Sequence, residues 1–315
     1  IVIAHPAVAK EAAVRARLLA LGFSEAISST FASRQDAELF AEKAAGTIPL
    51  ENPLSEEVGL LRPSLVPGMV AMLAHNLNRD VKEVRLFEQG TVFSGSTEKV
   101  DERPALAFGA AGLTPDQGAM HAPRPIEFHD LKGVVEQLVA RFEAQSVYFD
   151  RFPADAGLTP AWLHPYRSAR IAVEGETVGW FGQLHPREAA ARKIKDTVFL
   201  GELYIDRLYR LPLRKPAARE VSRFQPVRRD FSLVLNDSIP WQRIAHAIAA
   251  LNIPELIDWR AREVFRDKKI GAQEYSLLLG VTFQAPDRTL RDEELQQFQS
   301  RVLEALDKAG ARLRA

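Results

Sequence analysis

Hydrophobic residues in the last third of the chain follow two spacings in turn: every second residue, which is typical of a strand, and every third or fourth, which is typical of a helix. Ser238 and Pro240 mark the start of the first helix, and Gly310 marks the end of the second. The spacings predict a strand, a helix, two strands, a helix and a short last strand at about 231–235, 241–251, 257–266, 275–283, 290–309 and 311–315. This βαββαβ order predicts a ferredoxin-like fold over residues 223–315, in which two helices cover one face of a four-stranded antiparallel sheet and leave the other face open.

The first 206 residues show both spacings, which predicts a mixed α/β module. Apolar residues alternate with Lys, Glu and Arg over 7–21, and Gly22 ends this amphipathic helix. Asp130 stands where its side chain can cap another helix. Further elements are predicted as a helix at 64–77 and as strands at 25–31, 84–93, 169–173 and 178–184.

A basic stretch connects the two regions. Residues 207–229 contain eight basic residues, one acid (Glu220) and three prolines, so the local charge is +7. Proline opposes regular structure because it lacks a backbone N–H and restricts its own φ angle. The pattern predicts an inter-domain linker at 207–222, and its charge fits either a solvated connector or a surface that attracts nucleic acid.

Composition narrows the class of protein. The 315 residues are 46% hydrophobic and 26% charged, which is enough for two or more packed domains. Lys and Arg together number 41, as do Asp and Glu, so the net charge does not indicate a nucleic-acid partner. The lack of cysteine excludes disulfides and thiolate metal sites and fits a cytoplasmic location. No run of 18 apolar residues is present, which argues against a membrane span. The first residue is Ile1 and not Met, and we expect the chain to be a piece of a longer protein.

Five short segments occur in order along the chain: 61–69 (LRPSLVPGM), 85–90 (RLFEQG), 130–133 (DLKG), 182–186 (GQLHP) and 223–230 (RFQPVRRD). Together they resemble the C-terminal part of the β subunit of bacterial phenylalanyl-tRNA synthetase, and the resemblance covers essentially the whole chain. It implies an α+β fold with two parts. They are a class II synthetase-like antiparallel-sheet module at 1–206 that no longer catalyses, and a ferredoxin-fold anticodon-binding domain at 223–315. The β subunits of this family are longer, and their N-terminal modules, which include the editing domain and a reported magnesium site, have no counterpart here.

The resemblance also implies partners and cofactors. In the family, the module pairs with a catalytic α subunit, and two such heterodimers form an α2β2 heterotetramer that attaches phenylalanine to tRNA(Phe) with ATP and magnesium. The C-terminal domain binds the anticodon stem-loop. We therefore expect this portion to belong to an aminoacyl-tRNA ligase of the cytoplasm, to bind no cofactor itself, and to be catalytically inactive alone.

The two arginines that bind the phosphates of ATP in an active class II synthetase are missing from the sequence. Such a site needs one arginine at the end of a strand and a second after a glycine-rich strand, because fixed guanidinium groups offset the phosphate charges. Here the first strand continues into Ser-Gly-Ser at 94–96, and the glycine-rich stretch 179–184 ends in a His-Pro pair. No other catalytic residue or metal ligand is predicted. Glu56 and Glu57 are adjacent and so point in different directions, and the seven histidines lack the spacing of a zinc peptidase.

Charge and strand alternation identify candidate RNA contacts in the C-terminal domain. On its second strand, Arg260, Arg262 and Arg266 share one face, while the apolar residues between them face the helices. Phosphates would give such a face its affinity, and unstacked bases can lie against guanidinium or aromatic groups. A solvated face balanced by Glu263 and Glu274 is the alternative. The predicted tRNA-binding residues are Arg223, Phe224, Arg228, Arg229, Arg260, Arg262, Arg266, Lys268 and Lys269.

The predicted contact with the α subunit is the apolar helix around Met69, Met72 and Leu73, for which an ordinary core helix is the alternative. Two other functions stay open at this point. One is a self-sufficient single-chain synthetase, which also ends in a ferredoxin-like domain, although the missing arginines argue against it. The other is a stand-alone RNA-binding or scaffold protein, which failure to bind an α subunit would favour.

Overall fold

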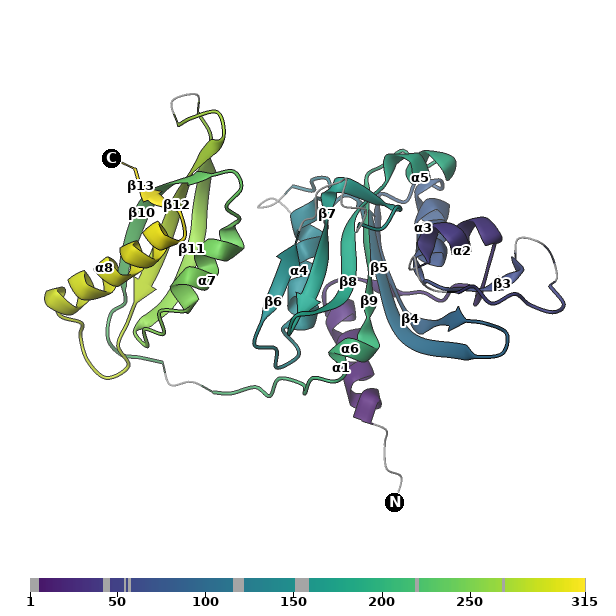
Figure 1. Ribbon diagram of the computed structural model, residues 1–315, viewed down its shortest axis with the longest axis horizontal. Helices are drawn as coiled ribbons and strands as arrows, with labels where there is room; N and C mark the ends of the chain where they lie inside the picture. The colour runs from purple at the N-terminus through teal and green to yellow at the C-terminus, as the bar shows by residue number, and fades with distance from the viewer. Residues whose placement is uncertain are drawn as a thin grey trace, which may run out of the picture. The chain divides into compact units, whose positions relative to one another are not determined.

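The computed structural model describes residues 6–41, 46–53, 55, 58–115, 122–150, 159–218, 221–267 and 270–314. The chain divides into two compact units, Ile1–Lys215 (unit 1) and Pro216–Ala315 (unit 2). Figure 1 shows a sheet with helices on both faces in unit 1, and a sheet with two helices on one face in unit 2. No helix within the described ranges is both long and apolar enough to cross a membrane.

Unit 1 is built on a seven-stranded sheet with the strand order β1-β4-β5-β9-β8-β7-β6. Every neighbouring pair is antiparallel except β1 and β4, which are parallel. The strands are β1 (Ser24–Glu25), β4 (Glu83–Gly95), β5 (Val100–Gly112), β6 (Val147–Asp150), β7 (Leu163–Val173), β8 (Glu176–Leu184) and β9 (Val198–Tyr204). A separate two-stranded sheet pairs β2 (Phe31–Ala32) with β3 (Leu60–Leu61).

Helices cover both faces of this sheet. α1 (Pro6–Ala20) and α4 (Phe128–Val139) pack on one face, where Phe108 of β5 belongs to their core. α3 (Val66–Leu77) packs on the other face, where the neighbouring Ala107 belongs to a second core. Since successive strand residues point to opposite faces, β5 is buried on both sides, as a central strand between two helical layers must be. The remaining helices of the unit are α2 (Arg34–Phe40), α5 (Pro186–Ala191) and α6 (Ile205–Leu208).

The burial of α3 corrects the predicted subunit contact. Met69 and Leu73 have no solvent-exposed surface, and Met72 is half-buried beside the same core. α3 can pack closely against β5 because Gly109 of β5 has no side chain. A methyl group there would lie 2.6 Å from Cδ1 of Leu73. Apolar spacing alone cannot tell a core helix from an interface helix, and here the core helix is the correct alternative.

The predicted linker at 207–222 is shorter than expected, because its first half is part of unit 1. Leu208 is buried in the core that α1 and α4 share. Arg210 lies 3.2 Å from Glu176, and Arg214 donates to the backbone carbonyls of Ala140 and Phe142 at 3.1 and 3.2 Å. Arg207 and Arg210 thus share the carboxylate of Glu176, and Arg214 is held by backbone carbonyls, so these three arginines belong to the surface of unit 1 and not to a free linker.

Unit 2 has the predicted order βαββαβ. Its elements are β10 (Val227–Asn236), α7 (Trp241–Ala249), β11 (Leu256–Phe265), β12 (Glu274–Phe283), α8 (Asp292–Lys308) and β13 (Arg312–Leu313). The four strands form an antiparallel sheet in the order β11-β12-β10-β13. The core lies between the sheet and α7 and α8, with Leu233, Leu279, Ile244 and Val302 at 1% exposure or less. The ferredoxin-like fold is confirmed.

Candidate functional site

The open face of the unit 2 sheet carries the candidate site. Residues directly opposite each other in an antiparallel pair point to the same side, so the register assigns each residue to a face. Leu277, Leu279 and Val281 of β12 are buried against the helices, and the residues between them point to the open side. Together with their partners on β10, the open face contains Ser276, Leu278, Gly280, Thr282, Arg228, Asp230, Ser232 and Val234.

Three of the predicted arginines lie on this face. Arg228 is opposite Thr282, and Arg260 is opposite Gly280. The side chain of Arg262 extends over Gly280. A methyl group in place of the glycine hydrogen would lie only 2.2 Å from its Nε. The absence of a side chain at Gly280 therefore leaves room for the Arg262 side chain over an inner strand of the sheet.

Two of these arginines are paired with acids of the same face. Arg260 lies 2.8 Å from Asp258, and Arg262 lies 3.4 Å from Asp230. Arg228 has no ion-pair partner in the described part of the chain. Because these pairs are exposed to water, each stabilises the fold by no more than about 1 kcal/mol, and a phosphate can compete for the arginines.

A β-bulge at Arg262 changes which residues of β11 reach this face. Ala261 is opposite Leu279, whereas Glu263 is opposite Leu278, so Arg262 is an extra residue with no partner in the ladder. A bulge shifts the alternation of all residues beyond it by one. The residues after the bulge therefore lie on the opposite faces from those predicted.

Phe265 and Arg266 exchange their predicted faces as a result. Phe265 is opposite Ser276 on the open side, with 46% of its surface exposed. The guanidinium of Arg266 instead lies 5.4 Å from the ring centroid of Tyr275, which packs against the helix-side core, and 2.6 Å from Asp237. The prediction that Arg266 lies on the open face is wrong, and no signal in the arginine spacing could have revealed this.

The other predicted RNA contacts are not gathered on this face. Arg223 is exposed and Phe224 is half-buried, and both precede the first strand. Arg229 is opposite a core residue of β12 and so lies on the helix side of the sheet. Lys268 and Lys269 lie outside the described residues.

Sequence reasoning missed two residues of the open face. Phe265 was assigned to the helices, because the bulge could not be foreseen. Arg312 of β13 is opposite Val234 and lies 2.6 Å from Glu274. A two-residue strand is too short to show alternation, so its side chains could be assigned only from the pairing.

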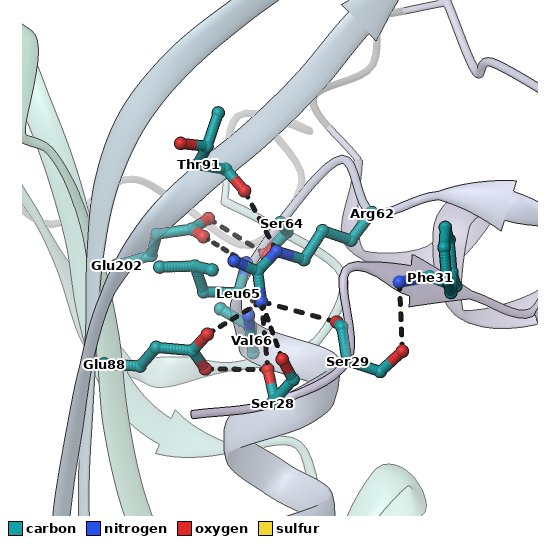
Figure 2. Close-up of polar contacts among 10 residues, drawn as sticks. All are labelled: Ser28, Ser29, Phe31, Arg62, Ser64, Leu65, Val66, Glu88, Thr91 and Glu202. Carbon is teal, nitrogen blue, oxygen red and sulfur yellow. Dashed lines mark hydrogen bonds and ion pairs between the residues drawn. The ribbon is translucent and has the colours of Figure 1, made fainter. Parts of the chain in front are cut away.

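Unit 1 contains a buried polar cluster around Arg62 (Figure 2). Its guanidinium lies 2.7 Å from Glu88 and also donates to the backbone carbonyls of Thr91, Ser28 and Ser29. The hydroxyl of Ser28 donates to the second oxygen of Glu88 at 2.7 Å. Because these hydrogen bonds accompany the ion pair, the charges are tolerated inside the module.

The cluster explains why the strand predicted at 25–31 is interrupted. The carbonyls of its middle residues are bonded to the Arg62 guanidinium and not to a neighbouring strand. A second buried carboxylate, Glu202, accepts hydrogen bonds from the hydroxyl of Ser64 at 3.0 Å and from the backbone N–H of Leu65 at 2.6 Å, at the start of α3 (Figure 2). Glu88 and Glu202 thus each hold segments of the chain together.

Residues 3–205 match the family described as "Phenylalanyl tRNA synthetase beta chain CLM domain", and residues 222–314 match the "Ferredoxin-fold anticodon binding domain". The chain belongs to the phenylalanyl-tRNA synthetase β chain family. The class II synthetase-like module followed by a ferredoxin-like domain, predicted from the sequence, is confirmed.

Curated relatives agree with this family. The chain is 34% identical over 295 residues to the phenylalanine–tRNA ligase β subunit of Pseudomonas fluorescens (strain Pf0-1), an alignment that covers 93% of this chain and 36% of the relative. It is 30% identical to that of Hahella chejuensis over 96% of this chain and 37% of the relative. The chain thus spans little more than a third of the length of these relatives. Pyrrolysyl-tRNA synthetase from Desulfitobacterium hafniense is a similar solved structure, with a TM-score of 0.45 and 14% identity over 64% of this chain and 67% of that one.

At the two positions where an active class II synthetase would carry its ATP-binding arginines, the residues of this chain have other roles in the structure. Ser94 and Gly95 end β4, and Ser96 lies in the turn that leads to β5. His185 caps α5, where its Nδ1 accepts a hydrogen bond from the backbone N–H of Arg187 at 3.1 Å. No cluster of three potential metal ligands occurs among the residues that the structure describes.

Proposed function

We propose that this chain is the C-terminal part of a phenylalanine–tRNA ligase β subunit, which supports a catalytic α subunit and binds the anticodon stem-loop of tRNA(Phe). The complete enzyme would attach phenylalanine to tRNA at the expense of ATP, with magnesium. The observation that carries the proposal is the arginine-bearing open face of unit 2, in a domain that matches the anticodon-binding family.

The open face is suited to a single-stranded loop and not to a duplex. Arg228, Arg260 and Arg262 supply positive charge for backbone phosphates. Phe265 adds an exposed ring on the same face, and a ring of this kind can stack with any unpaired base. Both elements of loop recognition are therefore present on one surface of the same sheet.

The contact with an α subunit is better placed on α1 than on the buried α3. Val14 and Leu18 point from α1 into the core. On the opposite side of the helix, Val8 and Leu19 are 52% and 51% exposed, and Ala12 between them is exposed as well. A helix that is apolar on the solvent side as well as on the core side fits a helix–helix interface, because isolated helices expose a polar face to water.

The chain itself would contribute no catalytic group. The buried acids Glu88 and Glu202 are occupied by internal hydrogen bonds, and both faces of the central strand β5 are filled by apolar cores. Unit 1 would then act as a scaffold for the active partner. Pyrophosphate exchange with phenylalanine and ATP tests this point, and clear activity of the chain alone would contradict it and favour a single-chain synthetase.

Reconstitution tests the proposal as a whole. The chain is mixed with a phenylalanyl-tRNA synthetase α subunit and tRNA(Phe), and the mass of the complex is read by native mass spectrometry. We expect a species that contains both chains and tRNA, with two copies of each chain. RNA binding without any association with the α subunit would favour a stand-alone RNA-binding protein.

A further inference from the structure

Unit 1 contains a cavity of about 840 Å³ between the end of α1, the sheet and α4. Leu21 and Phe23, which follow α1, form one apolar wall, and Ala110 of β5 and Val134 of α4 form another. Arg85 of β4 and Arg124 contribute cations to the lining, and Asp130 of α4 contributes a carboxylate. Cavities of this size typically receive ligands or side chains that combine an apolar body with a few polar groups.

Gly133 is one of the α4 residues that line this cavity, and it has no side chain to fill it. It lies in the middle of α4, and a methyl group added to it would have no neighbour within 4 Å. Glycine in a helix interior is less stable than alanine, because it loses more backbone freedom on folding. The packing of this chain therefore gives no reason for a glycine here. Because Gly133 has no side chain, a group in the cavity can reach the backbone of α4.

Arg85 is a largely buried cation with an incomplete set of partners. Only 15% of its side chain is exposed, and Glu83, which lies within 4 Å of it among the described residues, is 3.8 Å away and itself 42% exposed. The carboxylate of the cavity, Asp130, is bonded to Arg124, with distances of 2.7 and 2.8 Å to its two oxygens, and it interacts with Arg85 only through the electrostatic field. A buried charge without a close counter-ion is costly, so the site favours an incoming anion.

We propose that this cavity receives an apolar segment of a partner polypeptide that carries one acidic side chain, with the carboxylate beside Arg85 and the apolar part against α4 at Gly133. The inference rests on the proposed function, in which that partner is the α subunit. The two arginines and one carboxylate of this mixed lining, Arg85, Arg124 and Asp130, leave one positive charge in excess, which matches one carboxylate. An RNA backbone presents a phosphate at every nucleotide and needs a series of cations.

The affinity of the full chain for a phenylalanyl-tRNA synthetase α subunit tests the inference. Gly133→Leu places a side chain in the cavity, and Arg85→Gln removes the cation. We expect each to weaken the complex about tenfold or more, as for an anchor at the centre of an interface. Arg85→Gln should also reduce the salt dependence of the affinity, which a purely structural effect would leave unchanged.

Two matched variants separate the cavity from general damage. Gly133→Ala adds only one methyl group, so it should raise the thermal midpoint of the chain and weaken the complex far less than Gly133→Leu. Lys82→Gln removes an exposed cation that does not line this cavity and should leave the affinity unchanged. A wild-type complex that neither Gly133→Leu nor Arg85→Gln weakens would overturn the cavity inference alone. The absence of any wild-type complex would contradict the proposed function and the inference with it.

Discussion

The guanidinium of Arg62 lies 2.7 Å from the carboxylate of Glu88, and the two side chains are only 9% and 2% exposed. The pair joins three segments that are distant in sequence, because Arg62 follows β3, Glu88 belongs to β4, and Ser28 bonds to both. Gly90 leaves the space that the arginine needs, since a methyl group there would lie 2.5 Å from its Nη2.

Breaking this pair should destabilise unit 1 strongly. Glu88→Gln leaves the Arg62 charge buried without a counter-ion, and we expect a loss of about 3–5 kcal/mol in the free energy of unfolding. Urea denaturation of the full chain, followed by a probe in unit 1, measures it. The matched control is Arg34→Gln, which removes an exposed i,i+4 pair with Glu38 and should change stability by less than about 0.5 kcal/mol. Equal effects of the two variants would show that the buried pair does not stabilise the module.

Removing arginines of the open face should weaken RNA binding and its salt dependence. For each phosphate that the face no longer binds, the slope of log K against log salt concentration should fall by about 0.7, the value for single-stranded nucleic acid. We expect this for Arg228→Gln, Arg260→Gln and Arg262→Gln, measured by titration of tRNA(Phe) at several salt concentrations. Arg229→Gln and Arg266→Gln are the controls, because both residues lie on the helix side of the sheet. Slopes that fall equally for both sets would place the RNA elsewhere.

Phe265 should contribute to RNA affinity by stacking. Phe265→Ala removes the exposed ring and should weaken binding of the anticodon stem-loop by about 1–3 kcal/mol, without a change in the salt slope. Val264→Ala is a matched control from the adjacent position. Val264 is also well exposed but is opposite Leu277 on the helix side. Fluorescence anisotropy with a labelled stem-loop measures both variants, and equal losses would contradict the stacking role.

Asp130 should make the stability of unit 1 depend on pH. Its hydrogen bonds with Arg124 lower the pKa of this carboxyl below the ordinary 3.8, and the backbone N–H of Glu127 at the start of α4 acts in the same direction. A lowered pKa means that the ionised acid stabilises the folded state fully above pH 3.8, and that this stability is lost as the pH falls toward the folded pKa.

Asp130→Asn is therefore expected to cost about 1 kcal/mol at pH 7, as for loss of a helix cap, and progressively less below about pH 4. Denaturation series at several pH values give the difference between variant and wild type. Asp80→Asn serves for comparison, since Asp80 is exposed and the cation beside it, Lys82, is 3.9 Å away. If the free energy of unfolding of Asp130→Asn differed from that of the wild type by the same amount from pH 7 to pH 3, the ionised carboxylate of Asp130 would not be what stabilises the start of α4.

Local patterns in the sequence determined most of the elements and the fold class. The alternation at 231–235 and 275–283 and the helical spacing at 241–251 predicted β10, β12 and α7, because burial on one face repeats with the period of the element itself. The ordered segments predicted the family, and the missing arginines at 94–96 and after 179–184 predicted that no ATP clamp would be found there.

Only the tertiary structure decided which apolar and charged residues face a partner. Leu73 and Leu19 are both leucines at helical spacing, yet one fills the space above Gly109 and the other points to solvent. Arg260 and Arg266 have the same parity, yet the bulge at Arg262 sends them to opposite faces. Spacing along the chain specifies a residue's direction only within one regular element, whereas burial, bulges and close approaches depend on what another segment brings to the same place.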